Sequence, residues 1–291
     1  MAPTPKSLTL DLLATQRDGS MPVRALVEAG ALFGLAENSI RVALARMQAV
    51  GLVQRDARGR YRRGPASEAV QARVASWRRL HEDLAAWDGA WIAVHCTRRS
   101  GRAARRRSAR ALRLLGFREL EPGLDIRPDN LAGGVGAMRR QLVALGLEAG
   151  ALVAGLRDLD TVSDRRARQL WNTRELSDAY AESRRRLAQS VAGLPMLSNE
   201  AAMVETFLLG GSVLRQLVLD PLLPEAIVPT APRQALLEDM RAYDRLGRSS
   251  WAAFLARLDV PHVTNPVDLR VADAAGLGLS LPALTSTETG T

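Results

Sequence analysis

Residues 38–50 read NSIRVALARMQAV, and this stretch decides how the first part of the chain folds. Its apolar residues follow the i, i+3, i+4, i+7 spacing of one helix face, namely Ile40, Ala43, Leu44 and Met47. Asn38 is placed to cap such a helix, and Gly51 is placed to end it. We therefore expect a helix over residues 39–50 whose apolar face packs against the rest of the protein.

The opposite face of this helix is small and basic. Together with the residues at its N-terminal end, it presents Asn38, Ser39, Arg41, Val42, Ala45 and Arg46. Such a face suits insertion into a DNA major groove, which is about 12 Å wide. Arginine donates hydrogen bonds to guanine edges or to phosphates, and small apolar side chains contact thymine methyl groups. The sequence leaves open which of these contacts each residue makes.

The flanking residues complete a recognisable unit. Helical spacing over residues 7–16 and 23–33 predicts two helices before the basic one, with a turn at residues 18–20 and a stop at Gly34. Two short strands, residues 52–56 and 60–63, follow it around a glycine-containing turn. Three helices and a hairpin form a winged helix-turn-helix. The hairpin, or wing, crowds five arginines into nine positions, and we expect them to contact DNA: Arg55, Arg58, Arg60, Arg62 and Arg63.

Beyond the Gly64-Pro65 break, the chain reads as further domains of an α+β multidomain protein. Strand and helix patterns between residues 91 and 156 follow the order β-α-β-β-α-β, which is ferredoxin-like. Helical periodicity continues to residue 258, including predicted helices at 200–209, 211–219 and 233–246. We expect a winged helix at 1–64, a connector helix at 65–87, a ferredoxin-like domain at 88–164, a helical domain at 165–262 and a flexible tail at 263–291.

The charge of the chain is placed unevenly. The net charge is +9, yet residues 1–120 carry 22 basic and 10 acidic groups, whereas residues 121–291 carry 18 and 21. Lys6 is the sole lysine, and arginine offers a planar fork suited to phosphate oxygens. A GC-rich genome would explain the shortage of lysine, but it would not explain the one-sided placement. Nucleic acid is therefore the first partner to consider.

Part of this charge lies on the first helix of the central domain. Arg102, Arg106, Arg110 and Arg113 share one face and are candidate phosphate contacts, with Arg98, Arg99, Arg105 and Arg107 beside them. A charge run on an amphipathic helix is more often its solvated face. Both interpretations stay open.

Catalytic chemistry has little support in the sequence. One cysteine and three histidines cannot build a disulfide framework or a standard Cys/His zinc site. His95 and Cys96 are neighbours on a predicted strand, so their side chains point to opposite faces. The acidic cluster Asp158, Asp160 and Asp164 is explained by helix capping. We expect no enzyme activity, no catalytic residues, no metal and no cofactor. With no signal peptide or membrane span in the pattern, we expect a cytoplasmic protein that does not contact membranes.

The chain resembles PaaX-type transcriptional repressors over roughly residues 7–258. The resemblance rests first on the run from Leu32 to Met47, with Gly51-Leu52-Val53 and Gly59-Arg60-Tyr61. Further motifs agree: Trp87-Asp88-Gly89-Ala90-Trp91, Leu115-Gly116-Phe117, Leu120-Glu121-Pro122-Gly123-Leu124, Leu170-Trp171 and Leu219-Asp220-Pro221-Leu222-Leu223-Pro224. The sequence departs from the family at Leu124-Asp125-Ile126-Arg127, where a tryptophan is more common, and in the loop after Pro229, which lacks an expected tryptophan.

The resemblance implies a homodimeric repressor that binds operator DNA and is released by a small-molecule effector. In the family, the best-known effector is phenylacetyl-coenzyme A, so an aryl- or acyl-coenzyme A thioester and an aromatic-acid catabolic operon are implied here. The residues of the effector site remain unknown. Two alternatives are a constitutive DNA-binding protein and a metal-dependent nuclease, although the first central strand carries no carboxylate to hold a metal.

Overall fold

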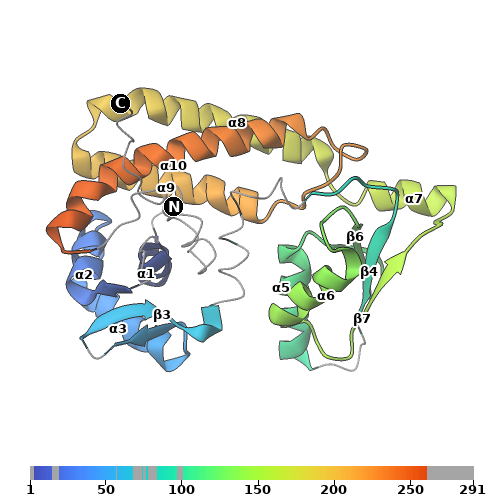
Figure 1. The fold of residues 1–291 in the computed structure, drawn as a ribbon, viewed down its shortest axis with the longest axis horizontal. Helices are drawn as coiled ribbons and strands as arrows, with labels where there is room; N and C mark the ends of the chain where they lie inside the picture. Colours follow the sequence, from blue (N-terminus) through green and yellow to red (C-terminus); the bar gives the residue numbers. More distant parts are fainter. Residues whose placement is uncertain are drawn as a thin grey trace. The chain divides into compact units, whose positions relative to one another are not determined.

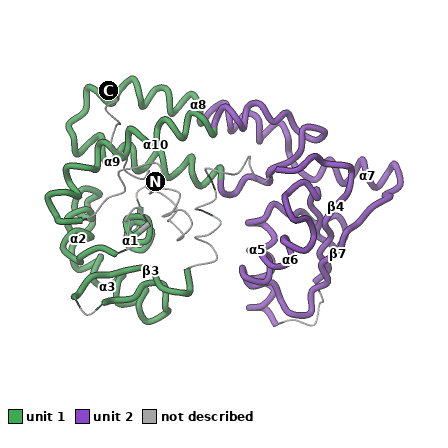
Figure 2. Tube along the Cα trace, viewed as in Figure 1, with its two compact units in different colours: residues 1–78, 183–217, 237–291 green, residues 79–182, 218–236 purple. Residues whose placement is uncertain are grey.

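The computed structural model describes residues 3–14, 20–56, 58–67, 74, 77, 84–96 and 101–260. Contacts divide the chain into two compact units (Figure 2). Unit 1 contains residues 1–78, 183–217 and 237–291, and unit 2 contains residues 79–182 and 218–236. The C-terminal helices are thus shared between the units. The predicted tail at 263–291 and most of the predicted connector helix lie outside the described residues, although Val74 and Trp77 are buried.

The N-terminal part of unit 1 consists of three helices and a small antiparallel sheet (Figure 1). Its elements are α1 (Pro5–Ala14), β1 (Ser20–Pro22), α2 (Val23–Leu32), α3 (Glu37–Ala49), β2 (Val53–Arg55) and β3 (Arg60–Arg63). The sheet has the order β1-β3-β2. The predicted helices and hairpin are confirmed, and β1 adds a third strand that the sequence pattern does not reveal.

The apolar face of α3 forms the centre of this region. Ile40, Leu44 and Met47 are buried, as predicted, whereas Ala43 is half-buried. The α2 and α3 helices approach closely at Gly30, because a Cβ added there would lie 3.0 Å from Cγ1 of Ile40. The apolar residues of α3 therefore pack this face of the helix against the core. The opposite face of α3 is left in contact with solvent.

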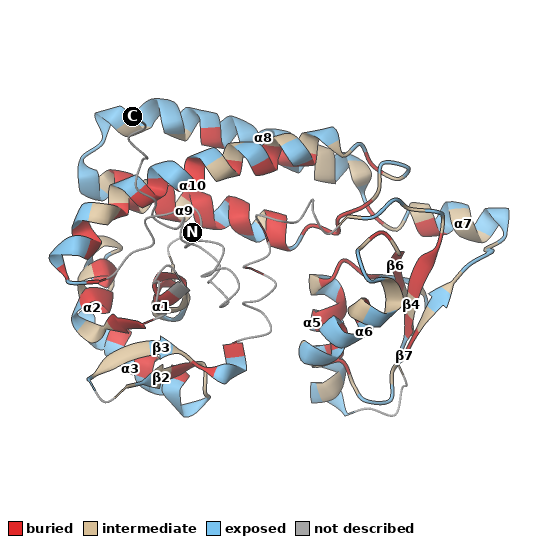
Figure 3. Ribbon diagram, viewed as in Figure 1, coloured by how far each residue is buried: buried red, intermediate tan, exposed pale blue. Residues whose placement is uncertain are grey.

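The core of the N-terminal region continues into two long helices of unit 1, α9 (Asn199–Val218) and α10 (Ala231–Arg257). The ring of Phe33, at the end of α2, lies 4.7 Å from that of Phe207 on α9 and 6.4 Å from that of Trp251 on α10. Trp251 also donates a 3.1 Å hydrogen bond to the carbonyl of Met203. Figure 3 shows buried residues along α9 and α10. The N-terminal region and these helices thus share one hydrophobic core.

Two predicted helix boundaries are wrong. The sequence predicts separate helices at 200–209 and 211–219, but α9 runs continuously through Gly210 and Gly211. Glycine inside a helix costs about 1 kcal/mol relative to alanine. Both glycines are buried, and the large apolar side chains of Val213, Leu214 and Leu217 in the next turns are buried as well, so packing offsets this cost. The α10 helix likewise continues past the predicted end at 246 to Arg257, because its last turns bury Trp251 and Leu255.

Among the described helices, α9 is long and apolar enough to meet the length and composition test for a membrane span. More than half of its apolar window, 56%, is buried inside the protein. It is therefore a core helix. The remaining long helix, α8 (Thr173–Gly193), connects to α9 through a short 3₁₀ turn, η3 (Leu194–Met196).

Unit 2 is built on a four-stranded antiparallel sheet. Its elements are β4 (Trp91–His95), α5 (Arg102–Leu114), β5 (Arg118–Glu121), β6 (Leu124–Pro128), α6 (Gly134–Ala144), β7 (Leu152–Leu156) and α7 (Thr161–Arg168). The strand order is β5-β6-β4-β7. The predicted order β-α-β-β-α-β is confirmed. One face of the sheet packs against α5 and α6 through Ile92, Val94, Leu112 and Met138.

Three tryptophans from two motifs, Trp87, Trp91 and Trp171, meet in a second apolar cluster of unit 2. Trp91 stacks on Trp171 with ring centroids 6.2 Å apart, and Trp87 meets Trp91 edge-on at 5.2 Å. The indole of Trp171 donates a 3.2 Å hydrogen bond to the carbonyl of Gly116. Gly116 has φ +79°, and a Cβ there would lie 2.8 Å from Cα of Pro221. Motifs distant in the sequence therefore meet around the loop that follows α9.

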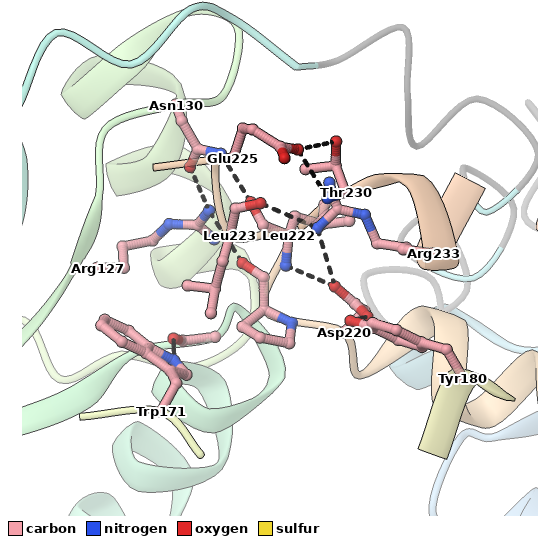
Figure 4. Close-up of polar contacts among 12 residues, drawn as sticks. Arg127, Asn130, Trp171, Tyr180, Asp220, Leu222, Leu223, Glu225, Thr230 and Arg233 are labelled. Atoms are coloured by element: carbon pink, nitrogen blue, oxygen red, sulfur yellow. Dashed lines mark hydrogen bonds and ion pairs between the residues drawn. The ribbon is translucent and has the colours of Figure 1, made fainter. Parts of the chain in front are cut away.

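A buried polar network holds that loop in place (Figure 4). The guanidinium of Arg127 is fully buried and donates to the carbonyl oxygens of Leu115 and Pro221. Arg127 also donates to the side-chain oxygen of Asn130, whose amide donates a 2.7 Å hydrogen bond to the Leu222 carbonyl. Buried backbone carbonyls require donors, and these two side chains supply them.

Asp220 anchors the other side of the same loop. Its carboxylate accepts hydrogen bonds from the Tyr180 hydroxyl and, at 2.7 Å, from the amide of Leu222, a residue with φ +53°. Arg233 lies 3.6 Å from Asp220 and donates to the Leu223 carbonyl at 3.0 Å. Burial, reinforced by the Asp220 charge, raises the pKa of Tyr180, so its hydroxyl remains a donor. The motif Asp220-Pro221-Leu222-Leu223-Pro224 is therefore structural.

Candidate nucleic-acid interface

The outer face of α3 is exposed as the sequence predicts. All six predicted contact residues of this face are exposed to solvent: Asn38, Ser39, Arg41, Val42, Ala45 and Arg46. The predicted capping role of Asn38 is wrong. The α3 helix begins at Glu37, and Ala36 occupies the cap position without a side-chain hydrogen bond to the helix amides. An acidic residue in the first turn is favoured by the helix dipole, and the earlier start leaves Asn38 free on the outer surface.

The two arginines of this face differ in their surroundings. The guanidinium of Arg41 pairs with Glu37 one turn earlier, with Nε and Nη2 each 2.7 Å from the same carboxylate oxygen. Arg46 is exposed, and no described residue forms an ion pair with it. Binding a phosphate or guanine through Arg41 would compete with an exposed ion pair, which typically contributes less than about 1 kcal/mol. Arg46 meets no such competition.

The start of α1 lies beside α3, a proximity that the sequence does not predict. A cavity of about 590 Å³ is lined by the first residues of α1, including Lys6, and by Arg46 and Val42 of α3. Thr4 caps α1, since its hydroxyl accepts a 3.1 Å hydrogen bond from the amide of Ser7. Helix N-termini attract phosphate because their amide groups are unpaired and the helix dipole is positive there. Lys6 and the α1 terminus thus extend the basic face of α3.

The five arginines of the wing divide into two groups. Arg55, Arg58 and Arg62 are exposed, whereas Arg60 and Arg63 are partly buried. Arg60 donates to the hydroxyl and carbonyl oxygens of Ser20 at 2.9 and 3.1 Å, so it ties β3 to β1. Burial lowers the pKa of Arg63 to about 10. The exposed arginines Arg55, Arg58 and Arg62 are therefore the cations of the wing that a phosphate backbone can reach.

The wing turn is shaped by one carboxylate. Asp56 accepts hydrogen bonds from the amides of Arg58 and Arg60 at 3.0 and 2.8 Å. Gly59 supplies the positive φ of +75° that the turn needs. The guanidinium of Arg55 lies near this turn and 6.0 Å from the ring centre of Tyr61. The local sequence therefore holds the wing arginines in a defined turn.

The arginine-rich helix of unit 2 is α5. Ser108, Ala111 and Leu112 are buried, and all four predicted phosphate contacts are exposed: Arg102, Arg106, Arg110 and Arg113. No described residue forms an ion pair with these four arginines. Arg98 and Arg99 lie outside the described residues. The helix presents a strongly basic face, and its contact with phosphate remains a prediction.

The thiol of Cys96, next to His95 in the sequence, has surroundings that disfavour a nucleophilic role. Burial raises the pKa of its thiol to about 11, assisted by the negative charges of Glu148 and Asp125. At neutral pH such a thiol is protonated and weakly nucleophilic. Asp160 caps α7, as expected, with bonds of 2.9 and 3.0 Å from the amides of Val162 and Ser163. Within the described part of the chain, no group of three His, Cys, Asp or Glu side chains is arranged to hold a metal ion.

Comparison with known proteins identifies the region that contains this basic surface. A sequence model of the family described as PaaX-like protein matches residues 4–64, which include α1, α3 and the wing. Over these residues the chain is similar to the PaaX-like family, and we call residues 4–64 the PaaX-like region. The PaaX-like region therefore carries the exposed basic residues of α3 and of the wing.

The fold beyond the PaaX-like region is also found in a solved structure. The uncharacterized protein Rv0674 from Mycobacterium tuberculosis is similar with a TM-score of 0.54 and 24% identity. The match covers 85% of this chain and 98% of that chain, so it supports a shared fold over most of the length. No curated protein matches the sequence.

Proposed function

We propose that this protein is a PaaX-type transcriptional regulator that binds double-stranded operator DNA through its N-terminal region. In this proposal the region is a winged helix, α3 enters the major groove, and the wing follows the backbone. The observation that carries the proposal is the exposed face of α3, where Arg46 has no ion-pair partner among the described residues and lines one cavity with Lys6 at the start of α1. The PaaX-like match over residues 4–64 supports the same function.

The shape and charge of the α3 face favour direct contact with bases. Its side chains other than arginine are small, including Ala45 and Val42, so the helix backbone can approach the groove floor. Arg58 and Arg62 on the wing supply charge without a fixed protein partner among the described residues. Phosphate contacts of this kind set affinity and register, while α3 supplies sequence preference.

We further propose that the protein is a cytoplasmic homodimer that represses an aromatic-acid or related catabolic operon. A two-fold symmetric dimer would place two α3 helices on a partly palindromic site. An aryl- or acyl-coenzyme A thioester is proposed as the effector that releases DNA. Unit 2, with the strand order of a ferredoxin-like domain, would serve as a scaffold and not as a nuclease, since β4 carries no carboxylate.

Fluorescence anisotropy on labelled DNA from immediately upstream of the gene tests this function. At fixed salt, with an excess of unrelated competitor DNA, a sequence-specific regulator keeps most of its complex. Titration with phenylacetyl-coenzyme A and other thioesters then tests release. Loss of the complex to competitor would instead support a constitutive protein that binds DNA with little sequence preference.

A further inference from the structure

Unit 1 contains a second cavity, which shares the lining residue Thr4 with the cavity beside α3. It has a volume of about 710 Å³ and lies between the first turns of α1 and the helices α8 and α9. Pockets for small organic molecules usually measure about 300–1,000 Å³ and combine apolar walls with a few polar groups. Here the apolar wall includes Phe207, Leu208 and Leu209, and the charged lining consists of two arginines, Arg186 and Arg215, and two carboxylates, Asp11 and Glu205.

Arg186 on α8 and Arg215 on α9 lie at similar positions along the axes of these two helices. The Ser183 hydroxyl on α8 hydrogen-bonds Gln216 on α9, and this contact fixes the register of two helices joined by a short reversing turn. Arg186 follows Ser183 by three residues, and Arg215 precedes Gln216 by one. At 1.5 Å per residue, the two arginines are offset by about one helical turn or less along the helix axes.

The two arginines of the cavity are not held in ion pairs within the described part of the chain. Both Arg186 and Arg215 are exposed, and no described residue forms an ion pair with either of them. By contrast, Arg184 on the same helix pairs with Asp239 at 2.7 Å. Two unpaired guanidinium groups facing one cavity repel each other and attract an anion, and arginine binds carboxylate and phosphate groups in a two-pronged geometry.

The other end of the cavity has a different character. Glu205 lines it ten residues before Arg215 on α9, about 15 Å away along the helix. Between these ends lie Phe207 and Leu208. A ligand that fits this arrangement has an anionic group at the arginines, an elongated apolar body, and a hydrogen-bond donor or no charge at the far end.

We propose that this cavity, called the groove from here on, is the binding site of an elongated organic anion. The carboxylate or phosphate group of the anion is held by Arg186 and Arg215. The effect of such a ligand on DNA rests on the proposed function. Thr4 lines both this groove and the cavity beside α3. Ser7, one turn further along α1, lines the groove alone. A ligand in the groove therefore contacts the helix terminus that also positions Lys6 beside Arg46, so binding at one side alters the other.

The groove is tested first without DNA. The probe is 8-anilinonaphthalene-1-sulfonate, an apolar body with one anionic group, whose fluorescence rises on binding. We expect the double variant Arg186→Ala/Arg215→Ala to raise the probe Kd about tenfold or more. Ser212→Trp keeps both arginines but fills the groove, and it should also abolish binding. Arg245→Ala, an exposed arginine of α10 outside the groove, serves as the control and should leave the Kd unchanged.

Competition identifies the source of the anion. Phenylacetate offers a carboxylate, whereas phenylacetyl-coenzyme A offers phosphates, and displacement of the probe by either one supports the site. A probe Kd unaffected by the double variant and by Ser212→Trp would overturn the proposal, as would the absence of saturable binding to the wild-type chain.

DNA binding then separates the two proposals. The double variant should bind operator DNA as tightly as the wild type while losing release by the displacing anion. Release that persists in the double variant would place the ligand elsewhere and overturn the site. Absence of DNA binding by the wild type would refute the proposed function, whereas the probe experiment would still decide whether the groove binds anions.

Discussion

Substitution of Asp220 by asparagine should destabilise unit 2 strongly. The Asp220 side chain is 1% exposed, and it pairs with Arg233, whose side chain is 6% exposed. Asparagine keeps the size of the side chain and still accepts the Leu222 amide, but it leaves the Arg233 charge buried without its carboxylate. Breaking one partner of a buried ion pair typically costs about 3–5 kcal/mol. We expect a loss of about 3 kcal/mol, because Arg233 also donates to the Leu223 carbonyl.

Urea unfolding followed by tryptophan fluorescence measures this loss, because Trp87, Trp91 and Trp171 cluster in unit 2. For an unfolding slope of about 1–3 kcal/mol per molar urea, the midpoint should fall by about 1–3 M. Glu225→Gln provides a matched control, since Glu225 is an exposed carboxylate of the same segment that accepts hydrogen bonds from Thr230. Its effect should be much smaller.

The double variant Asp220→Asn/Arg233→Met separates charge burial from packing. Once the cation is removed, no uncompensated charge remains, so the double variant should be more stable than Asp220→Asn alone. A midpoint for Asp220→Asn equal to that of the wild type would refute the reasoning. A double variant whose loss equals the sum of the two single losses would show that the ion pair does not stabilise the loop.

Three further results are expected. Gly64→Ala should lower the melting temperature of unit 1, at a cost of about 1–3 kcal/mol, since its Cβ would lie 2.1 Å from the Gly51 carbonyl oxygen, and an unchanged melting curve would contradict this. Burial raises the pKa of the Cys96 thiol from 9.0 to about 11, so at pH 8 it should react with iodoacetamide roughly a hundredfold more slowly in the native than in the unfolded chain. Equal rates in the two states would show that the thiolate is exposed in the native chain. Replacing Arg58 and Arg62 by alanine should weaken binding to all DNA sequences alike and lower the salt slope by about 0.9 per lost phosphate contact, whereas a change in sequence preference would place the wing on base edges.

Local patterns predicted the elements that the basic surface depends on. The 3.6-residue spacing of Ile40, Leu44 and Met47 identified both the buried face of α3 and the opposite exposed face. Alternation of strand and helix patterns gave the element order of unit 2. These features depend on neighbours in the sequence, so a single sequence contains them.

Features made by distant residues were not predictable in this way. Lys6 and Arg46 line one cavity because α1 packs against α3, and the N-terminal core is completed by the contacts of Phe33 with Phe207 and Trp251. The division of the wing arginines likewise depends on β1, a three-residue strand without a pattern of its own. The local sequence at Gly210 and Gly211 predicts a helix break, but α9 runs through both glycines because its neighbouring side chains are packed in the core.

Binding of operator DNA by the exposed face of α3, as proposed above, can be measured in a single titration. Anisotropy of labelled upstream DNA, at fixed salt with competitor, is measured for the wild type, Arg46→Ala and the control Arg174→Ala, whose side chain is 92% exposed outside the PaaX-like region. Arg46→Ala should weaken binding by about 1–3 kcal/mol, roughly 5- to 150-fold, with an unchanged circular dichroism spectrum, while Arg174→Ala binds as the wild type does. Equal affinities for all three proteins would contradict the assignment of α3 as the DNA-recognition helix.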